Sequence, residues 1–278
     1  MATLYGGAMP DDFVSGEELT ATEFNKVKNY WIVDGDLPEG PEINDGDVVF
    51  VLGDAAVGTA DITAITGSGV THTYDGCVAF EFLTSGTMTC TQGLLNEVLL
   101  VGGGGGSGGS SNQTVGAATN SQGGGGGGGG FLSVPDLFVP ASTLNVLVGA
   151  GGVLDSYITS YGLQGGTSAI EGITYSVGGG GGGNRLLRTG TVGGSGGGNG
   201  ATTAAGGSAI PGLGNDGGAG TSGGAGGGAS AAGTGTLASL AAPSLPGDGL
   251  ASTITGSSVT YGGGGASGGG STGGAGGG

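Results

Sequence analysis

The chain has 278 residues, of which 78 are glycine, and only 9% are charged, whereas about a quarter is usual in a globular protein. Residues 1–100 hold 16 of the 21 acids and two of the four basic residues, Lys26 and Lys28, whereas residues 101–278 are nearly neutral. Nucleic-acid binding needs clustered Lys and Arg, so this composition excludes a nucleic-acid partner. It also excludes a polybasic membrane-binding patch.

The hydropathy pattern argues against membrane insertion and secretion. No apolar run reaches the roughly 18 residues that suggest a transmembrane helix. The first 16 residues contain Asp11 and Asp12 and have no basic region, so no secretory signal is expected. We therefore expect the protein to be made in a cytoplasm and to leave it by lysis or within an assembly.

The acidic front predicts one helix followed by β-strands. A helix is expected over residues 15–30, because Ser15 can cap its N-terminus and apolar residues approximate one face. A strand over residues 31–33 completes a first segment, residues 1–33, and a β-rich domain is expected over residues 34–101. Its expected strands are residues 48–52, 61–66, 70–74, 77–82, 87–91 and 96–101.

The two cysteines, Cys77 and Cys90, are expected to be free and buried. The strands that contain them are predicted to pair as a hairpin across residues 83–86, which would place Cys90 opposite Glu81. A disulfide bond would need a different register, because its two sulfurs must lie close together. A bridge or a metal-binding pair is the less favoured alternative.

Residues 102–278 are predicted to form a glycine-rich domain, for which two interpretations compete. A flexible linker is the ordinary interpretation of Gly/Ser-rich sequence. Ordering is costly, since residues 101–278 contain 65 glycines. Ordering a glycine costs about 0.5–1 kcal/mol more conformational free energy than ordering an alanine. Order is favoured because the tail has little charge and its glycine tracts alternate with apolar pieces. These pieces are residues 131–139, 144–148, 173–177 and 237–261.

A local repeat of three residues favours the ordered interpretation. From residue 217 to 226 glycine recurs at every third position, while Ala219, Ser222 and Ala225 fall on one edge. This spacing suits a polyproline-II-type helix, whose backbone groups have no partners within the helix. Without side chains, neighbouring helices can approach closely enough to bond to one another. The predicted fold class is mainly β, with a short N-terminal helix, an antiparallel β front domain, and packed polyglycine-II-like helices and short strands behind it.

No catalytic, cofactor-binding or metal site is predicted. His72 is expected to be a surface residue of a strand rather than a catalytic base. Asp34, Asp36, Asp45 and Asp47 superficially suit Ca²⁺, but their spacing does not complete a calcium-binding loop. The first glycine run follows a strand but lacks the Gly-Lys-Ser/Thr of a phosphate-binding loop.

Residues that interrupt the glycine tracts are the candidates for receptor contact, because aromatic residues and Arg are favoured at binding hot spots. One interruption holds two tyrosines, and another holds the only basic residues of the back half. The candidates are Tyr157, Tyr161, Arg185, Leu186, Leu187 and Arg188. The alternative interpretation is that these residues pack the edges of the scaffold or form a subunit contact.

Three segments resemble proteins of bacteriophage tails. Residues 72–109, in which an aromatic strand and a Ser-Gly-Thr turn lead to a strand ending in VGGGGG, are similar to the opening of glycine-rich domains in phage tail proteins. Residues 144–183 continue in that family's order, with LNVLVGAGG and then GITYSVGGGGGG. Residues 13–33 resemble the start of phage minor tail and fibre proteins.

The resemblance implies a structural virion protein of a phage tail tip or tail fibre that takes part in host attachment as an adhesin. Residues 1–33 would then be an attachment or oligomerisation segment. The implied partners are other tail proteins, further copies in a homotrimer, and a glycan, lipid or protein receptor on the host cell. A purely architectural virion protein, such as a capsid-decorating fibre or a connector, stays open as the alternative, and an enzyme is the least favoured class.

Overall fold

The chain divides into two compact units, residues 1–59 and 60–278. The computed structural model describes residues 4–5, 31–32, 58–109, 123–153, 161–184, 189–200, 204–221, 223–235, 244–267 and 272–277. In the first unit, β1 (Leu4–Tyr5) pairs antiparallel with β2 (Trp31–Ile32). The expected helix over residues 15–30 and the expected strand over residues 48–52 lie outside the described residues.

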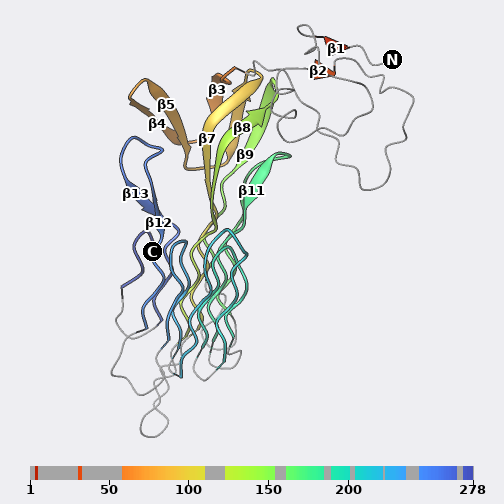
Figure 1. The fold of residues 1–278 in the computed structure, drawn as a ribbon. Coiled ribbons are helices and arrows are strands. Elements are labelled where there is room, and N and C mark those ends of the chain that lie inside the picture. Colours follow the sequence, from red (N-terminus) through yellow and green to blue (C-terminus); the bar gives the residue numbers. More distant parts are fainter. Residues whose placement is uncertain are drawn as a thin grey trace, which may run out of the picture. The chain divides into compact units, whose positions relative to one another are not determined.

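The second unit is mainly β, and its described residues contain no α-helix. Five strands form one antiparallel sheet in the order β11-β10-β9-β6-β3, and β4–β5, β7–β8 and β12–β13 form two-stranded sheets (Figure 1). The strands are β3 (Ile62–Thr66), β4 (Gly69–Tyr74), β5 (Cys77–Phe82), β6 (Gly86–Cys90), β7 (Gly93–Val101), β8 (Phe131–Val139), β9 (Ser142–Leu147), β10 (Ser168–Ile170), β11 (Thr174–Ser176), β12 (Leu250–Ser252) and β13 (Val259–Tyr261). The mainly β class predicted from sequence is confirmed for this part of the chain.

A small apolar core lies on one face of the five-stranded sheet. Side chains alternate between the two faces of a strand, so Met88 and Cys90 of β6 point inward, while Thr89 between them faces outward. On the outer face, the Thr89 hydroxyl lies 2.9 Å from the Thr143 hydroxyl of β9. The buried members of the core cluster are Ala60, Met88, Cys90, Leu95, Leu100, Val139, Leu144, Val146 and Ile170.

The expected hairpin between residues 77–82 and 87–91 is wrong. β5 pairs instead with β4, across a two-residue turn formed by Asp75 and Gly76. Both residues have positive φ, 45° and 77°, as a type I′ hairpin turn requires, and Asp-Gly is one of its preferred sequences. The Asp-Gly turn closes β4 onto β5, and β6 is then free to pair with β3 and β9.

Both cysteines are free, as expected. The expectation that both are buried is confirmed for Cys90 and wrong for Cys77. Cys77 is exposed because it follows the hairpin turn directly, in a two-stranded sheet. Cys90 lies opposite Ile62 and Ser142, rather than opposite Glu81 as the wrong hairpin would require. Burial in the core raises the pKa of the Cys90 thiol.

Beyond the sheets, glycine-rich segments run side by side and are joined by backbone hydrogen bonds (Figure 1). We call these segments the glycine bundle. They are residues 102–109, 123–130, 149–153, 161–167, 177–184, 189–200, 204–209, 214–221, 223–235, 244–249, 262–267 and 272–277. β7 passes directly into this bundle at Gly102, and the segment ending at Gly130 passes directly into β8, so the second unit contains both the sheets and the bundle.

The bundle segments change bonding partner on a cycle of three residues. In the segment 102–109, every third N–H group donates to the segment 123–130, while others donate to the segment 161–167. The first set of bonds joins Gly102 to Gly130, Gly105 to Gly127 and Gly108 to Gly124, and the second joins Gly103 to Gly166 and Gly106 to Leu163, at distances of 2.8 to 2.9 Å. Each segment thereby satisfies its backbone groups through several neighbours rather than one.

The segment 123–130 is the centre of the bundle. All eight of its glycines are buried, and its backbone bonds to five other bundle segments. A β-carbon built on Gly126, Gly127 or Gly128 would lie 2.0, 2.2 or 2.1 Å from a carbonyl oxygen of a neighbouring segment. Glycine is required here because no side chain fits between backbones at these distances.

A few buried polar side chains, inside the bundle or at its border with the sheets, bond to its glycine backbone. The buried Asn199 amide donates to the Gly220 carbonyl at 2.8 Å and accepts from the Gly220 N–H at 3.0 Å. The buried Ser176 hydroxyl donates to the Gly130 carbonyl at 2.7 Å. Buried polar groups must be paired to be tolerated, and these groups obtain their partners from the glycine backbone.

Candidate functional site

The glycine bundle has two different ends. At the sheet end its segments continue into β-strands or tight turns. The opposite end, which we call the connector end, contains every described residue that borders a gap between bundle segments (Figure 1). These flanking residues are 109 and 123, 153 and 161, 184 and 189, 200 and 204, 221 and 223, 235 and 244, and 267 and 272.

Hydrogen bonds between adjacent segments establish that these flanks lie together. The bonds, written from N–H to carbonyl, join Gly108 to Gly124, Gly124 to Gly183, Gly183 to Gly198, Gly162 to Gly182, Leu163 to Val153, Asn199 to Gly218, Ala225 to Thr234 and Thr234 to Leu245. The Ser244 and Ser267 hydroxyls add a side-chain contact between two further flanks. Seven chain connections therefore begin and end at one end of the same bundle.

The residues predicted from sequence to contact a receptor belong to two of these connections. Tyr161 is half-buried and borders one of them. The Gly162 N–H donates to the Gly182 carbonyl at 2.9 Å, so Tyr161 lies beside the segment that ends at Asn184. The other candidates, Tyr157, Arg185, Leu186, Leu187 and Arg188, lie outside the described residues. The structure therefore brings together the described flanks of both predicted interruptions.

An apolar ridge leads to this end and was missed in the sequence. Val153 and Leu163 are 62% and 45% exposed, and they are adjacent because the Leu163 N–H donates to the Val153 carbonyl at 2.9 Å. Along the chain, Leu147, Ala150 and Val153 are all exposed and occur three residues apart. The same three-residue period that revealed the glycine repeat would have revealed this ridge.

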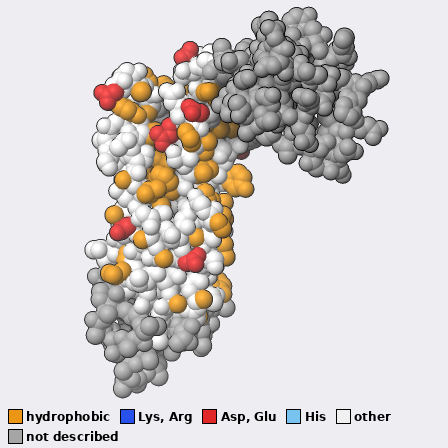
Figure 2. Space-filling model, viewed as in Figure 1, with side chains coloured by type: hydrophobic (Ala, Val, Ile, Leu, Met, Phe, Trp, Pro, Cys, Tyr) orange, Lys and Arg blue, Asp and Glu red, His pale blue; other side chains and the backbone are white. Residues whose placement is uncertain are grey.

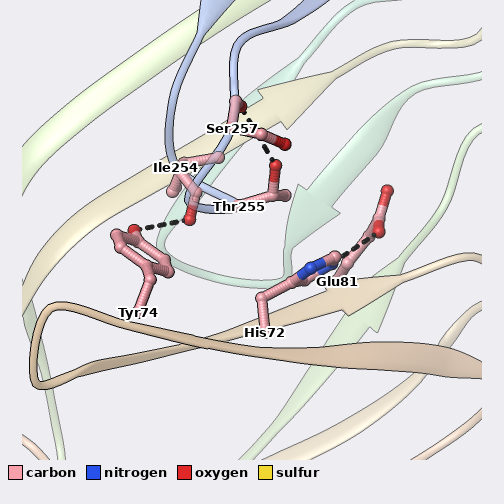
Figure 3. Close-up of polar contacts among 6 residues, drawn as sticks. All are labelled: His72, Tyr74, Glu81, Ile254, Thr255 and Ser257. Carbon is pink, nitrogen blue, oxygen red and sulfur yellow. Dashed lines mark hydrogen bonds and ion pairs between the residues drawn. The ribbon is translucent and has the colours of Figure 1, made fainter.

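A separate polar cluster joins the β4–β5 hairpin to the turn of the β12–β13 hairpin (Figure 3). The His72 Nε2 lies 3.0 Å from the Glu81 Oε2, which links the two strands of the first hairpin. The Tyr74 hydroxyl donates to the Ile254 carbonyl at 2.7 Å, which links the two hairpins. Gly256, with φ of 84°, lies so close to the Tyr74 ring that a β-carbon would be 2.7 Å from it.

Next to this cluster, the pKa of the Tyr261 hydroxyl is raised above its ordinary value. Burial raises the pKa of the Tyr261 hydroxyl, the negative charge of Glu81 raises it further, and a hydrogen bond with Thr255 acts in the opposite direction. His72 lies on a strand surface, with a quarter of its side chain exposed. The contacts of the cluster fasten two hairpins together, and this is a structural role.

The described residues of the chain carry only negative formal charge at neutral pH, because all four Lys and Arg residues lie outside them. On the face drawn in Figure 2 the acidic side chains are scattered singly among apolar and uncharged groups. No group of three or more His, Cys, Asp or Glu in the described part could hold a metal ion. Among the same residues, no helix combines the length and apolar character needed to cross a bilayer.

A family model described as a glycine-rich domain matches residues 83–278. The match covers more than half of the chain, and the chain belongs to this glycine-rich domain family. It begins just before β6, so it includes the central strands of the five-stranded sheet together with the whole bundle. No curated protein and no solved structure matches the chain.

Proposed function

We propose that this chain is a structural virion protein of a bacteriophage tail tip or tail fibre, and that its connector end faces the host cell. The observation that carries the proposal is that the described flanking residues of seven connections gather at one end of the bundle. Five of them, residues 110–122, 154–160, 185–188, 201–203 and 236–243, contain a single glycine between them. In sequence, these connections are therefore rich in side chains, whereas the bundle segments that flank them are mostly glycine.

The bundle is suited to hold the flanking residues of these connections at fixed positions. We infer that its segments are polyglycine II helices, because their bonds recur every three residues and reach several neighbours. Bonding in several directions makes each segment depend on its neighbours, so the connector end is anchored along its whole width. Both arginines of the back half, Arg185 and Arg188, belong to one connection, and arginine is enriched at binding hot spots.

We further propose that the chain forms a homotrimer. The ridge of Leu147, Ala150 and Val153 is exposed, apolar and repeats every three residues. A surface of this kind favours contact with another copy, because it can be buried without removing a charge from water. Sedimentation of the wild-type chain and of Val153→Asp tests this: the wild type should sediment as a trimer and the variant as a smaller species.

Adsorption of intact phage to host cells tests the attachment role. The double variant Arg185→Ala/Arg188→Ala should reduce the adsorption rate at least tenfold, with unchanged particle yield and unchanged amount of the chain per particle. The control is Asp61→Ala/Glu171→Ala, which removes two exposed charges next to the ends of β3 and β10 and should adsorb normally. Normal adsorption by the arginine variant would contradict receptor contact through this connection.

The position of the chain on the particle tests the virion assignment. Gold-labelled antibody against the chain, viewed by electron microscopy of purified phage, should mark the tail tip or fibres. Labelling of the capsid instead would favour the architectural alternative, and absence of the chain from purified particles would refute both.

A further inference from the structure

A half-open surface pocket of about 380 Å³, which we call the cavity, lies at the sheet end of the bundle, away from the connector end. Its walls come from the start of β8, the turn at residues 212–215, the turn at residues 229–230 and the start of β12. This volume falls within the range of about 300–1,000 Å³ that is typical of small-molecule sites. The cavity is large enough for one sugar unit or a group of similar size.

The walls of the cavity are fastened to one another by hydrogen bonds. The Phe131 N–H donates to the Leu213 carbonyl at 2.9 Å. The Asn215 amide donates to the carbonyls of Gly228 and Ala229 at 2.9 and 3.1 Å. A site held in this way needs little ordering when a ligand binds, which favours affinity.

The cavity is lined by both apolar side chains and hydrogen-bond acceptors. Phe131, Leu213 and Leu250 supply the apolar surface. The protons of two lining hydroxyls are already engaged in hydrogen bonds within the protein. The Ser133 hydroxyl donates to Glu97 at 2.9 Å, and the Ser230 hydroxyl donates to the Asp248 carbonyl at 3.1 Å. Lone pairs remain on these hydroxyls, so the cavity accepts hydrogen bonds from a ligand.

Charge narrows the ligand class further. Glu97 is bonded to one of the lining hydroxyls, and the described residues contain no Lys or Arg that could balance a bound anion. An anionic group would have to give up water here without gaining a counter-charge. The chemistry that fits is an uncharged group with several hydroxyl donors and one apolar face, which describes a neutral sugar ring.

We propose that this cavity is a binding subsite for a neutral sugar unit of a polysaccharide. The apolar face of the ring packs on Phe131 and Leu250, and its hydroxyls donate to the oxygens of Ser133, Ser230 and Asn215. The proposal stands on the cavity and does not require the virion assignment. Sugar binding without a role in adsorption, or adsorption without sugar binding, would separate the two.

Titration calorimetry with the full chain tests the proposal. The probes are neutral oligosaccharides of glucose, galactose, mannose and N-acetylglucosamine, with oligoglucuronate as the anionic comparison. At least one neutral probe should bind with a dissociation constant below about 1 mM, and the anionic probe at least tenfold more weakly. Failure of all neutral probes to bind, or a preference for the anionic probe, would overturn the proposal.

Two variants locate the binding. Leu250→Trp fills the cavity from a side chain that is 43% exposed, and its control is Val259→Trp, on the partner strand β13 and 37% exposed. The first should weaken binding at least tenfold and the second should leave it unchanged. If Leu250→Trp does not fold, Ser230→Tyr closes the cavity from an exposed position. Undiminished binding by a folded variant of either kind would overturn the proposal.

Discussion

Replacing Gly127 by alanine should destabilise the second unit, because this glycine lies in the central segment of the bundle. A β-carbon at residue 127 would be 2.2 Å from the Ser195 carbonyl oxygen and 2.7 Å from that of Gly196. Gly151 is the matched control, since it lies on the outside of the bundle and its β-carbon would meet no atom nearer than 3.9 Å. Neither glycine has positive φ, so alanine is not strained by the backbone conformation at either position.

The two substitutions have the same effect on the unfolded chain and differ only in the space available. With no clash, Gly→Ala stabilises a protein by about 0.4–1 kcal/mol, because the unfolded chain loses freedom. For Gly127→Ala the neighbouring segment must move by roughly 1 Å to restore ordinary contact distances. Overpacking of this kind costs about 1–3 kcal/mol, so we expect net destabilisation by about 1–2 kcal/mol at residue 127 and slight stabilisation at residue 151.

Differential scanning calorimetry of the full chain measures both effects on the transition of the second unit. In a unit of this size, 1 kcal/mol corresponds to a shift in Tm of about 2–4 °C. Gly127→Ala should therefore melt roughly 2–8 °C below the wild type, and Gly151→Ala at or slightly above it. Equal Tm values for the two variants would refute the claim that glycine is required in the bundle for steric reasons.

Three further predictions concern single side chains. Asn199→Ala should destabilise the second unit by about 2–4 kcal/mol in thermal unfolding, because it leaves the buried N–H and carbonyl of Gly220 without the side-chain amide that pairs with them. As the control, Asn145→Ala at an exposed position should cost less than about 1 kcal/mol. A thiol reagent such as DTNB should modify the exposed Cys77 in the native protein and the buried Cys90 only after unfolding; rapid reaction of two thiols in the native state would contradict the core packing. Because folding raises the pKa of Tyr261, the unfolding free energy should fall as the pH rises above about 10, and Tyr261→Phe should reduce this fall. An unchanged pH dependence would contradict the burial of the Tyr261 hydroxyl, which is the larger cause, together with the effect of the Glu81 charge.

The sequence predicted individual strands well because their side chains alternate. β6 and β9 place apolar residues at every second position, which a half-buried strand requires. The pairing of β5 was predicted wrongly, because two turn signals compete in that region. The turn at Ser85 and Gly86 was preferred, although Asp75 and Gly76 form the pair that suits a type I′ turn.

The arrangement of the bundle segments could not be derived from sequence for a physical reason. The central segment is a run of eight glycines, and identical residues carry no pattern that could fix a register or select neighbours. A few other residues do distinguish one position from another: Asn199 and Ser176 bond to particular glycines. The gathering of the flanking residues at one end follows from this up-and-down arrangement, so it could not be predicted from the sequence either.

The central claim is that the glycine-rich part of the chain is a hydrogen-bonded scaffold and not a flexible linker. Amide hydrogen exchange, followed by NMR on the full chain labelled with ¹⁵N-glycine, measures this directly. The N–H groups of Gly124, Gly127 and Gly130 are bonded at 2.7 to 2.8 Å and buried, so they should exchange at least a thousandfold more slowly than an unstructured glycine, consistent with opening energies near those of a protein core. Exchange of these three amides at the rate of an unstructured chain would contradict the account.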